Sequence, residues 1–167
     1  SSAVAIIKLN GADYVTIDGS NNGSTSQNLS VINTNTGTSS AVVWLASTAT
    51  DGTTNNTLKN CTLTGNASTT TLGGIVSSGS TVGAVAEVAN SNNTYQNNTI
   101  SLSYYGIATV GPTGTQSGTA ISSNAIGTVT NAIGFGGMFV SNDNATISGN
   151  TVQNVVTSAA SSGGIIL

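Results

Sequence analysis

Charge is nearly absent from this chain of 167 residues: charged residues make up 4% of it, with two basic residues, five acidic ones and no histidine. The two cations are Lys8 and Lys59. Because neutralising a nucleic-acid backbone needs clustered lysine and arginine, nucleic acid is excluded as a partner. No apolar run approaches the roughly 18 residues of a membrane span, so we expect no membrane insertion.

Cysteine, proline and tryptophan each occur once. The single cysteine, Cys61, excludes an internal disulfide, and without histidine it lacks the usual partner of a catalytic thiol. The same absence removes serine–histidine catalysis and the commonest zinc ligands. We therefore expect no cofactor and no metal, and we interpret Cys61 as a small buried residue in a turn.

The few carboxylates are spread along the chain rather than grouped. Hydrolysis of a glycosidic bond needs two carboxyl groups near each other, and only Asp13 and Asp18, which flank one short apolar stretch, are candidates. Turn dipeptides and turn-like surroundings account for most of the acids, whereas Glu87 is expected on the solvent face of a strand. We therefore predict that the chain is not an enzyme; the remaining acids are Asp51 and Asp143.

Valine, isoleucine and threonine are frequent and evenly spread, between clusters of asparagine, glycine and serine. Residues branched at Cβ favour strands, and the intervening residues favour turns. The apolar runs are too short for helices, and polar and apolar residues alternate within them. The chain is therefore predicted to be all-β.

A six-residue motif occurs four times: apolar, polar, small or Asn, Asn (once Cys), Thr or Ala, apolar. Its copies begin at Leu58, Tyr95, Ile121 and Ile147, at spacings of 37, 26 and 26 residues. A degraded copy is predicted at Leu29, which lies 29 residues before Leu58. Repetition at such a period is typical of a solenoid.

A second repeated element, a short apolar run usually containing glycine, lies between the motifs. We place its copies at Val43, Ile75, Ile107, Ile133 and Ile165. The shortest repeat is 12 plus 14 residues, and longer repeats carry insertions in the turns, as solenoids tolerate. Segments 20–27 and 157–162 are among those predicted to be loops. Each repeat therefore supplies about three short strands, and residues 1–167 are predicted to form one domain.

The motif copies resemble right-handed parallel β-helix repeats of the pectate-lyase-like type, as found in long secreted or cell-surface bacterial proteins. The resemblance implies a single-stranded β-helix of about six coils with three parallel sheets. It also implies a ladder of stacked side chains at one tight turn, formed here by Asn98, Asn124 and Asn150, with Cys61 in the same column. A short amide can satisfy the polar backbone groups of such a turn.

Two functions are compatible with these observations. We favour a non-catalytic structural or adhesive solenoid, extracellular or on the cell surface: a stalk, an adhesin repeat or a filament subunit. Its expected partners are further repeats or copies of itself at open coil ends, and a surface glycan. Because the chain begins and ends in apolar patterns, we expect a fragment of a longer protein or one subunit of a stack.

The alternative function is a carbohydrate-binding or polysaccharide-cleaving β-helix. Aromatic rings on the face of a solenoid stack on sugars, but they also pack in cores and turns. The candidate carbohydrate contacts are Tyr14, Trp44, Tyr104 and Tyr105.

Overall fold

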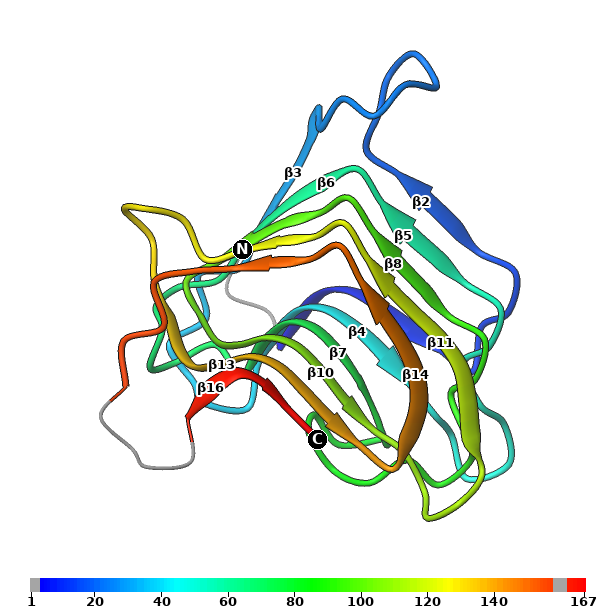
Figure 1. The fold of residues 1–167 in the computed structure, drawn as a ribbon. Coiled ribbons are helices and arrows are strands. Elements are labelled where there is room, and N and C mark those ends of the chain that lie inside the picture. The colour runs from blue at the N-terminus through cyan, green and yellow to red at the C-terminus, as the bar shows by residue number, and fades with distance from the viewer. Residues whose placement is uncertain (1–3, 158–161) are drawn as a thin grey trace.

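Short runs rich in Val, Ile and Thr form strands, and the Asn- and Gly-rich segments between them turn the chain from one sheet to the next. The structure is a computed structural model that describes residues 4–157 and 162–167. In this described part the regular elements are sixteen strands, all paired in parallel, and no helix. The chain winds as a parallel β-helix (Figure 1).

Three sheets form the walls of this β-helix. Sheet A contains β1 (Ala5–Asn10), β4 (Ala41–Ala46), β7 (Gly73–Ser78), β10 (Ser103–Val110), β13 (Ile133–Ser141) and β16 (Gly163–Ile166). Sheet B contains β2 (Thr16–Asp18), β5 (Thr57–Lys59), β8 (Thr94–Gln96), β11 (Gln116–Ser122) and β14 (Asp143–Ser148). Sheet C contains β3 (Leu29–Ile32), β6 (Cys61–Thr64), β9 (Thr99–Ser101), β12 (Ala125–Ile126) and β15 (Thr151–Val152).

Each coil contributes one strand to each sheet, in the order A, B, C. The described residues therefore form five complete coils and the first strand of a sixth. The prediction of an all-β parallel β-helix with three sheets and about six coils is confirmed.

The repeated motif marks the passage from sheet B to sheet C. Leu58, Tyr95, Ile121 and Ile147 pair with one another across β5, β8, β11 and β14. The predicted fifth copy at Leu29 is wrong, because Leu29 pairs with Cys61 in sheet C. The true first member of the column is Ile17, which pairs with Leu58.

The second repeated element forms the centre of sheet A, but one of its copies was predicted at the wrong residue. Val43, Ile75 and Ile107 pair as predicted, but Ile107 is followed by Met138 rather than Ile133. The pairing of β10 with β13 is irregular, which moves the register by one residue near the start of β13.

A column of glycines explains why Met138 takes this place. A Cβ on Gly74, Gly106 or Gly137 would lie 2.2–2.4 Å from a side chain of sheet C, where Ile100, Ile126 and Val152 pack. Only glycine fits at that close approach, and in β13 the residue before Met138 supplies it.

The inward side chains of the three sheets fill one continuous core. The fully buried members of this core include Leu63, Ile75, Ile100, Ile107, Ile121, Ile126 and Met138.

Glu87 does not lie in a strand. It belongs to the segment between β7 and β8, where no strand is formed, so the prediction that it lies on a strand is wrong. The predicted loop at 157–162 lies largely outside the described residues.

Candidate functional site

Buried asparagines bridge adjacent coils at the turn from sheet B to sheet C, in what we call the inner ladder. Asn98 Oδ1 accepts the backbone N–H of Cys61 (3.0 Å), and Asn124 Oδ1 accepts that of Asn98 (3.0 Å). Asn150 Oδ1 accepts the N–H of Asn124 (2.9 Å). In the opposite sense, the three Nδ2 groups donate to backbone carbonyls of the preceding coil, at Leu58, Tyr95 and Ile121.

Cys61 occupies the inner-ladder column at a position where no acceptor is needed. The residue before it in the column is Leu29, whose N–H already donates to the carbonyl of Gly19 (3.0 Å). An amide at Cys61 would therefore find no free N–H to accept. The thiol is fully buried, and burial raises its pKa, which makes it a poor nucleophile.

The residue before each inner-ladder position has left-handed backbone geometry. These residues are Asn60, Asn97, Ser123 and Gly149, with φ between 50° and 62°. Glycine and asparagine adopt this region most readily, which explains the "small or Asn" position of the motif. The left-handed turn points these side chains to the outside of the β-helix, beside the inner ladder.

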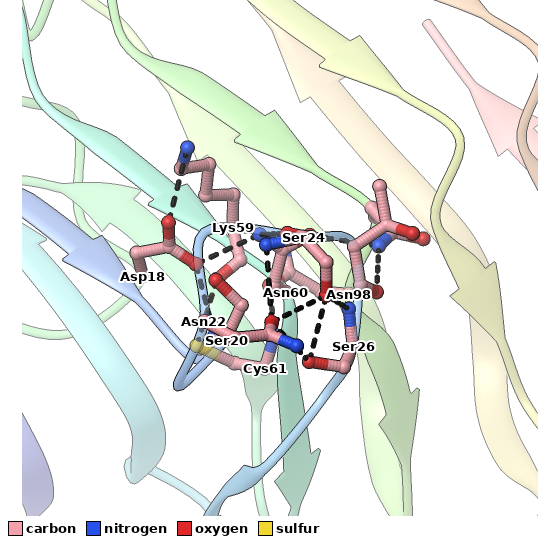
Figure 2. Close-up of polar contacts among 11 residues, drawn as sticks. Asp18, Ser20, Asn22, Ser24, Ser26, Lys59, Asn60, Cys61 and Asn98 are labelled. Atoms are coloured by element: carbon pink, nitrogen blue, oxygen red, sulfur yellow. Dashed lines mark hydrogen bonds and ion pairs between the residues drawn. The ribbon is translucent and has the colours of Figure 1, made fainter.

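A second, shorter set of amide contacts runs along this outside column, and we call it the outer ladder. Asn60 Nδ2 donates to Asp18 Oδ1 (2.7 Å), and Asn97 Nδ2 donates to Asn60 Oδ1 (2.7 Å). Lys59 Nζ lies 3.1 Å from Asp18 Oδ2, and Figure 2 draws this ion pair as a dashed line. The bonds from Asn60 and from the N–H of Ser20, with the Lys59 ammonium, hold the pKa of Asp18 well below its usual range.

The segment 20–28 is an insertion in this turn, present in the first coil, and it protrudes between β2 and β3 (Figure 1). Asn22, Ser24 and Ser26 bond to one another within it (Figure 2). Gln27 Nε2 donates to the carbonyl of Asn97 (2.7 Å), and Asn97 Nδ2 donates to the carbonyl of Thr25 (2.9 Å). The loop of coil 1 is thereby fastened to coil 3.

A polar cleft of about 470 Å³ lies between this loop and the outer ladder. Its lining holds no aromatic or aliphatic residue and combines the loop of coil 1 with the turns of coils 2 to 4. The lining residues are Gly23, Ser24, Thr25, Lys59, Asn60, Gln96, Asn97 and Ser123.

Segment 20–27 is predicted from sequence only as a loop, and this prediction misses the site. Because the first copy of the motif was predicted at Leu29 instead of Ile17, the segment was not recognised as an insertion in the turn from sheet B to sheet C. The signal is present in the sequence: the motif position after Ile17 is filled by Asp18-Gly19, and the next strand begins only at Leu29.

The four aromatic candidates do not lie in the cleft. Tyr14 is 80% exposed, in the turn before β2, and Trp44 is 6% exposed, with its Nε1 donating to Ser78 Oγ. Tyr104 and Tyr105 are brought together with two phenylalanines: Tyr104 stacks on Phe135 with ring centres 5.1 Å apart, and Tyr105 stacks on Phe139 at 5.2 Å. The rings contact one another and form a partly exposed aromatic cluster.

The acidic residues are held by separate partners. Asp13 Oδ1 accepts from the N–H and the hydroxyl of Thr54 (2.8 and 2.6 Å). Glu87 accepts from the hydroxyls of Ser47 and Ser80, both at 2.5 Å, which lowers its pKa to about 2. Among the described residues, no group of three or more His, Cys, Asp or Glu side chains is arranged to hold a metal ion.

Residues 4–157 and 162–167 contain no helix of the length and hydropathy that a membrane span requires.

Comparison of the chain with protein-family models, with curated proteins and with solved structures found no match. The geometry of the coils and of the cleft is therefore the basis for a functional proposal.

Proposed function

We propose that this chain is a non-catalytic structural or adhesive β-solenoid outside the cell: a stalk, an adhesin repeat or a filament subunit with right-handed, pectate-lyase-like coils. The inner ladder supports a rigid rod of stacked coils, since the third, fourth and fifth coils are each hydrogen-bonded to the preceding one in the same way. Its surface is rich in hydroxyl and amide groups and nearly free of charge.

The direction of the inner ladder is the observation that carries this proposal. The backbone N–H groups of Cys61, Asn98 and Asn124 are each received by an amide of the following coil. Within the described residues, the equivalent N–H of Asn150 donates to no acceptor. The face formed by β14 and β15 thus offers the same donor to any further coil that carries an asparagine in this column.

Unpaired strand edges support stacking as well. Within residues 4–157 and 162–167, sheets B and C end at β14 and β15 on one side and at β2 and β3 on the other. Such edges pair readily with another strand, and lysine on an edge strand opposes this pairing. Several apolar side chains near the two end faces are also exposed, among them Leu29, Ile32 and Ile165.

Electron microscopy of the purified native particle tests the proposal, with filaments or long stalks as the expected result. Thr151→Lys places a charge on the edge strand β15 and is expected to abolish end-to-end assembly. Thr62→Lys is the matched control, because Thr62 occupies the same column in an interior coil. Discrete monomers for the unmodified protein would contradict a structural role.

The alternative function, carbohydrate binding or cleavage, is favoured by one observation, the polar cleft. Incubation with acidic and neutral polysaccharides separates the two functions, since a structural protein releases no product. Release of oligosaccharides by the pure protein would overturn the proposal of a non-catalytic solenoid.

A further inference from the structure

We propose that the polar cleft beneath segment 20–28 binds a neutral glycan. This inference rests on the proposed function as an adhesive solenoid, and it adds the binding site and the class of ligand. It depends on hydrogen-bonding groups that the fold brings to the surface and does not itself use.

The unused groups lie where the outer ladder stops. Asn97 Nδ2 donates to Asn60 Oδ1 and to the carbonyl of Thr25, whereas Asn97 Oδ1 accepts no bond from the described residues. The next residue of the column is Ser123, which is exposed and whose hydroxyl has no partner in the described part of the chain. A ligand hydroxyl placed between them would donate to Asn97 Oδ1 and accept from Ser123 Oγ.

Gln96 adds a third unused group beside these two. Its side chain is exposed at the end of β8, and its amide forms no hydrogen bond with the described residues. Gln96 pairs with Ser122, the neighbour of Ser123, across β8 and β11. The cleft therefore presents an amide donor, an amide acceptor and a hydroxyl on two adjacent coils.

The charge of the cleft selects a neutral ligand. Lys59 is the one cation in the lining, and it is paired with Asp18 at 3.1 Å. A nucleic acid or a polyuronate would need cationic groups that the cleft does not supply. With no aliphatic or aromatic side chain in the lining, a peptide would find no anchor for an apolar side chain.

Size and periodicity favour a chain of sugars. A volume of about 470 Å³ falls within the roughly 300–1,000 Å³ of ligand clefts. Coils stack about 4.7–4.9 Å apart, so polar groups recur at that spacing along the β-helix. A glycan lying parallel to the axis meets Lys59, Gln96 and Ser123 on successive coils, with segment 20–28 as a side wall.

Titration of ¹⁵N-labelled protein with neutral oligosaccharides (gluco-, manno-, galacto- and N-acetylglucosamine series) tests the proposal, with tetragalacturonate as the charged comparison. We expect amide shifts confined to residues 23–25, 59–60, 96–97 and 123, at millimolar or lower concentrations of at least one neutral series. The proposal fails if no neutral series shifts these amides, or if only the uronate does.

The double variant Gln96→Ala, Ser123→Gly removes two of the unused groups and keeps the left-handed turn, since Gly149 occupies the same column with φ 62°. We expect binding at least tenfold weaker with an unchanged unfolding midpoint. Ser148→Ala is the control, because Ser148 lies in the Gln96 column but outside the cleft. Equal affinity in the double variant would overturn the proposal. If the unmodified protein binds glycan but forms no filaments or stalks, the structural role is contradicted and the glycan site stands.

Discussion

The inner and outer ladders run side by side along the same turn, yet they differ in regularity. In the inner ladder Asn98 and Asn124 are at most 1% exposed, and each step repeats the same pair of contacts. The outer ladder begins with a carboxylate, Asp18, continues through two amides and ends at Ser123. Both columns follow the same turn, so their difference lies in what the backbone of the preceding coil requires from each side chain.

The partners of the backbone N–H groups explain why one ladder repeats and the other varies. A buried backbone N–H without a partner costs about 1–3 kcal/mol, so Asn98, Asn124 and Asn150 must each supply an acceptor to the preceding coil. In the outer column the N–H groups of Asn60, Asn97 and Ser123 already donate to backbone carbonyls of the next coil, so the side chains there are free to vary. We infer that variation between coils, and with it ligand recognition, is concentrated in the outer column.

The largest effect is expected from Asn124→Leu, in the middle of the inner ladder. It leaves the N–H of Asn98 without its acceptor in a dry interior, and it removes the hydrogen bond that Asn124 Nδ2 donates to the carbonyl of Tyr95. At about 1–3 kcal/mol for the unpaired N–H and about 1 kcal/mol for the lost hydrogen bond, the free energy of unfolding should fall by roughly 2–4 kcal/mol. Urea denaturation measures this loss, and Asn144→Leu, at an exposed site, should change stability by less than about 0.5 kcal/mol. Equal effects of the two changes would show that the ladder contributes little.

Asn150→Leu should destabilise less, by about 1–3 kcal/mol. The Asn150 amide makes the same two kinds of hydrogen bond as the Asn124 amide, to a backbone N–H and to a backbone carbonyl of the preceding coil. However, Asn150 is only partly buried, so water replaces part of this hydrogen bonding in the variant. The same denaturation series measures the difference from Asn124→Leu. A destabilisation as large as that of the central variant would indicate that the last coil is as dry as the interior.

Cys61→Asn restores the repeat pattern and should nevertheless bring no stabilisation. Because the N–H of Leu29 is already bonded to Gly19, the new Oδ1 would be buried without a donor, at a cost of about 1 kcal/mol. The change in thermal unfolding midpoint gives the sign. A rise in the midpoint would mean that the first coil shifts to continue the ladder. Cys61→Ser is the control for loss of the thiol.

The smallest effect is expected on the loss of stability at low pH, through Asp18. The pKa of Asp18 is lowered in the folded state, so its contribution to stability is complete above the ordinary value of about 3.9 and declines as the pH falls towards the folded-state pKa. Asp18→Asn should remove this part of the acid sensitivity and leave the uncharged inner ladder intact. Unfolding midpoints of both proteins between pH 6 and pH 2 test the prediction, and parallel curves would contradict it.

Much of the fold could be predicted because the solenoid is a local repeat. Spacing alone placed Leu58, Tyr95, Ile121 and Ile147 in one column. The errors at Leu29 and Ile133 share a physical cause: insertions change the count of residues in a turn, while register depends on packing. Only the contact of Gly137 with Val152 shows why Met138, and not Ile133, continues the column.

The cleft could be predicted far less well than the coils. Its residues come from a loop in coil 1 and from the corners of coils 2 to 4, and the spacing in sequence does not show that Gln27 reaches Asn97. For the aromatic candidates, the prediction failed in the opposite direction. Trp44 was predicted as a carbohydrate contact from the sequence, but it is buried in the fold. Long-range contacts of a loop are not periodic, so no repeat reveals them.

The sequence by itself determined the class, the three strands per coil and the column that holds Asn98, Asn124 and Asn150, because alternation of polar and apolar residues and the cost of unsatisfied backbone act locally in these coils. Tertiary structure alone decided which loop lies over which turn, where the outer ladder stops and which polar groups stay unused. Those features depend on contacts between residues about 70 positions apart, such as Gln27 and Asn97.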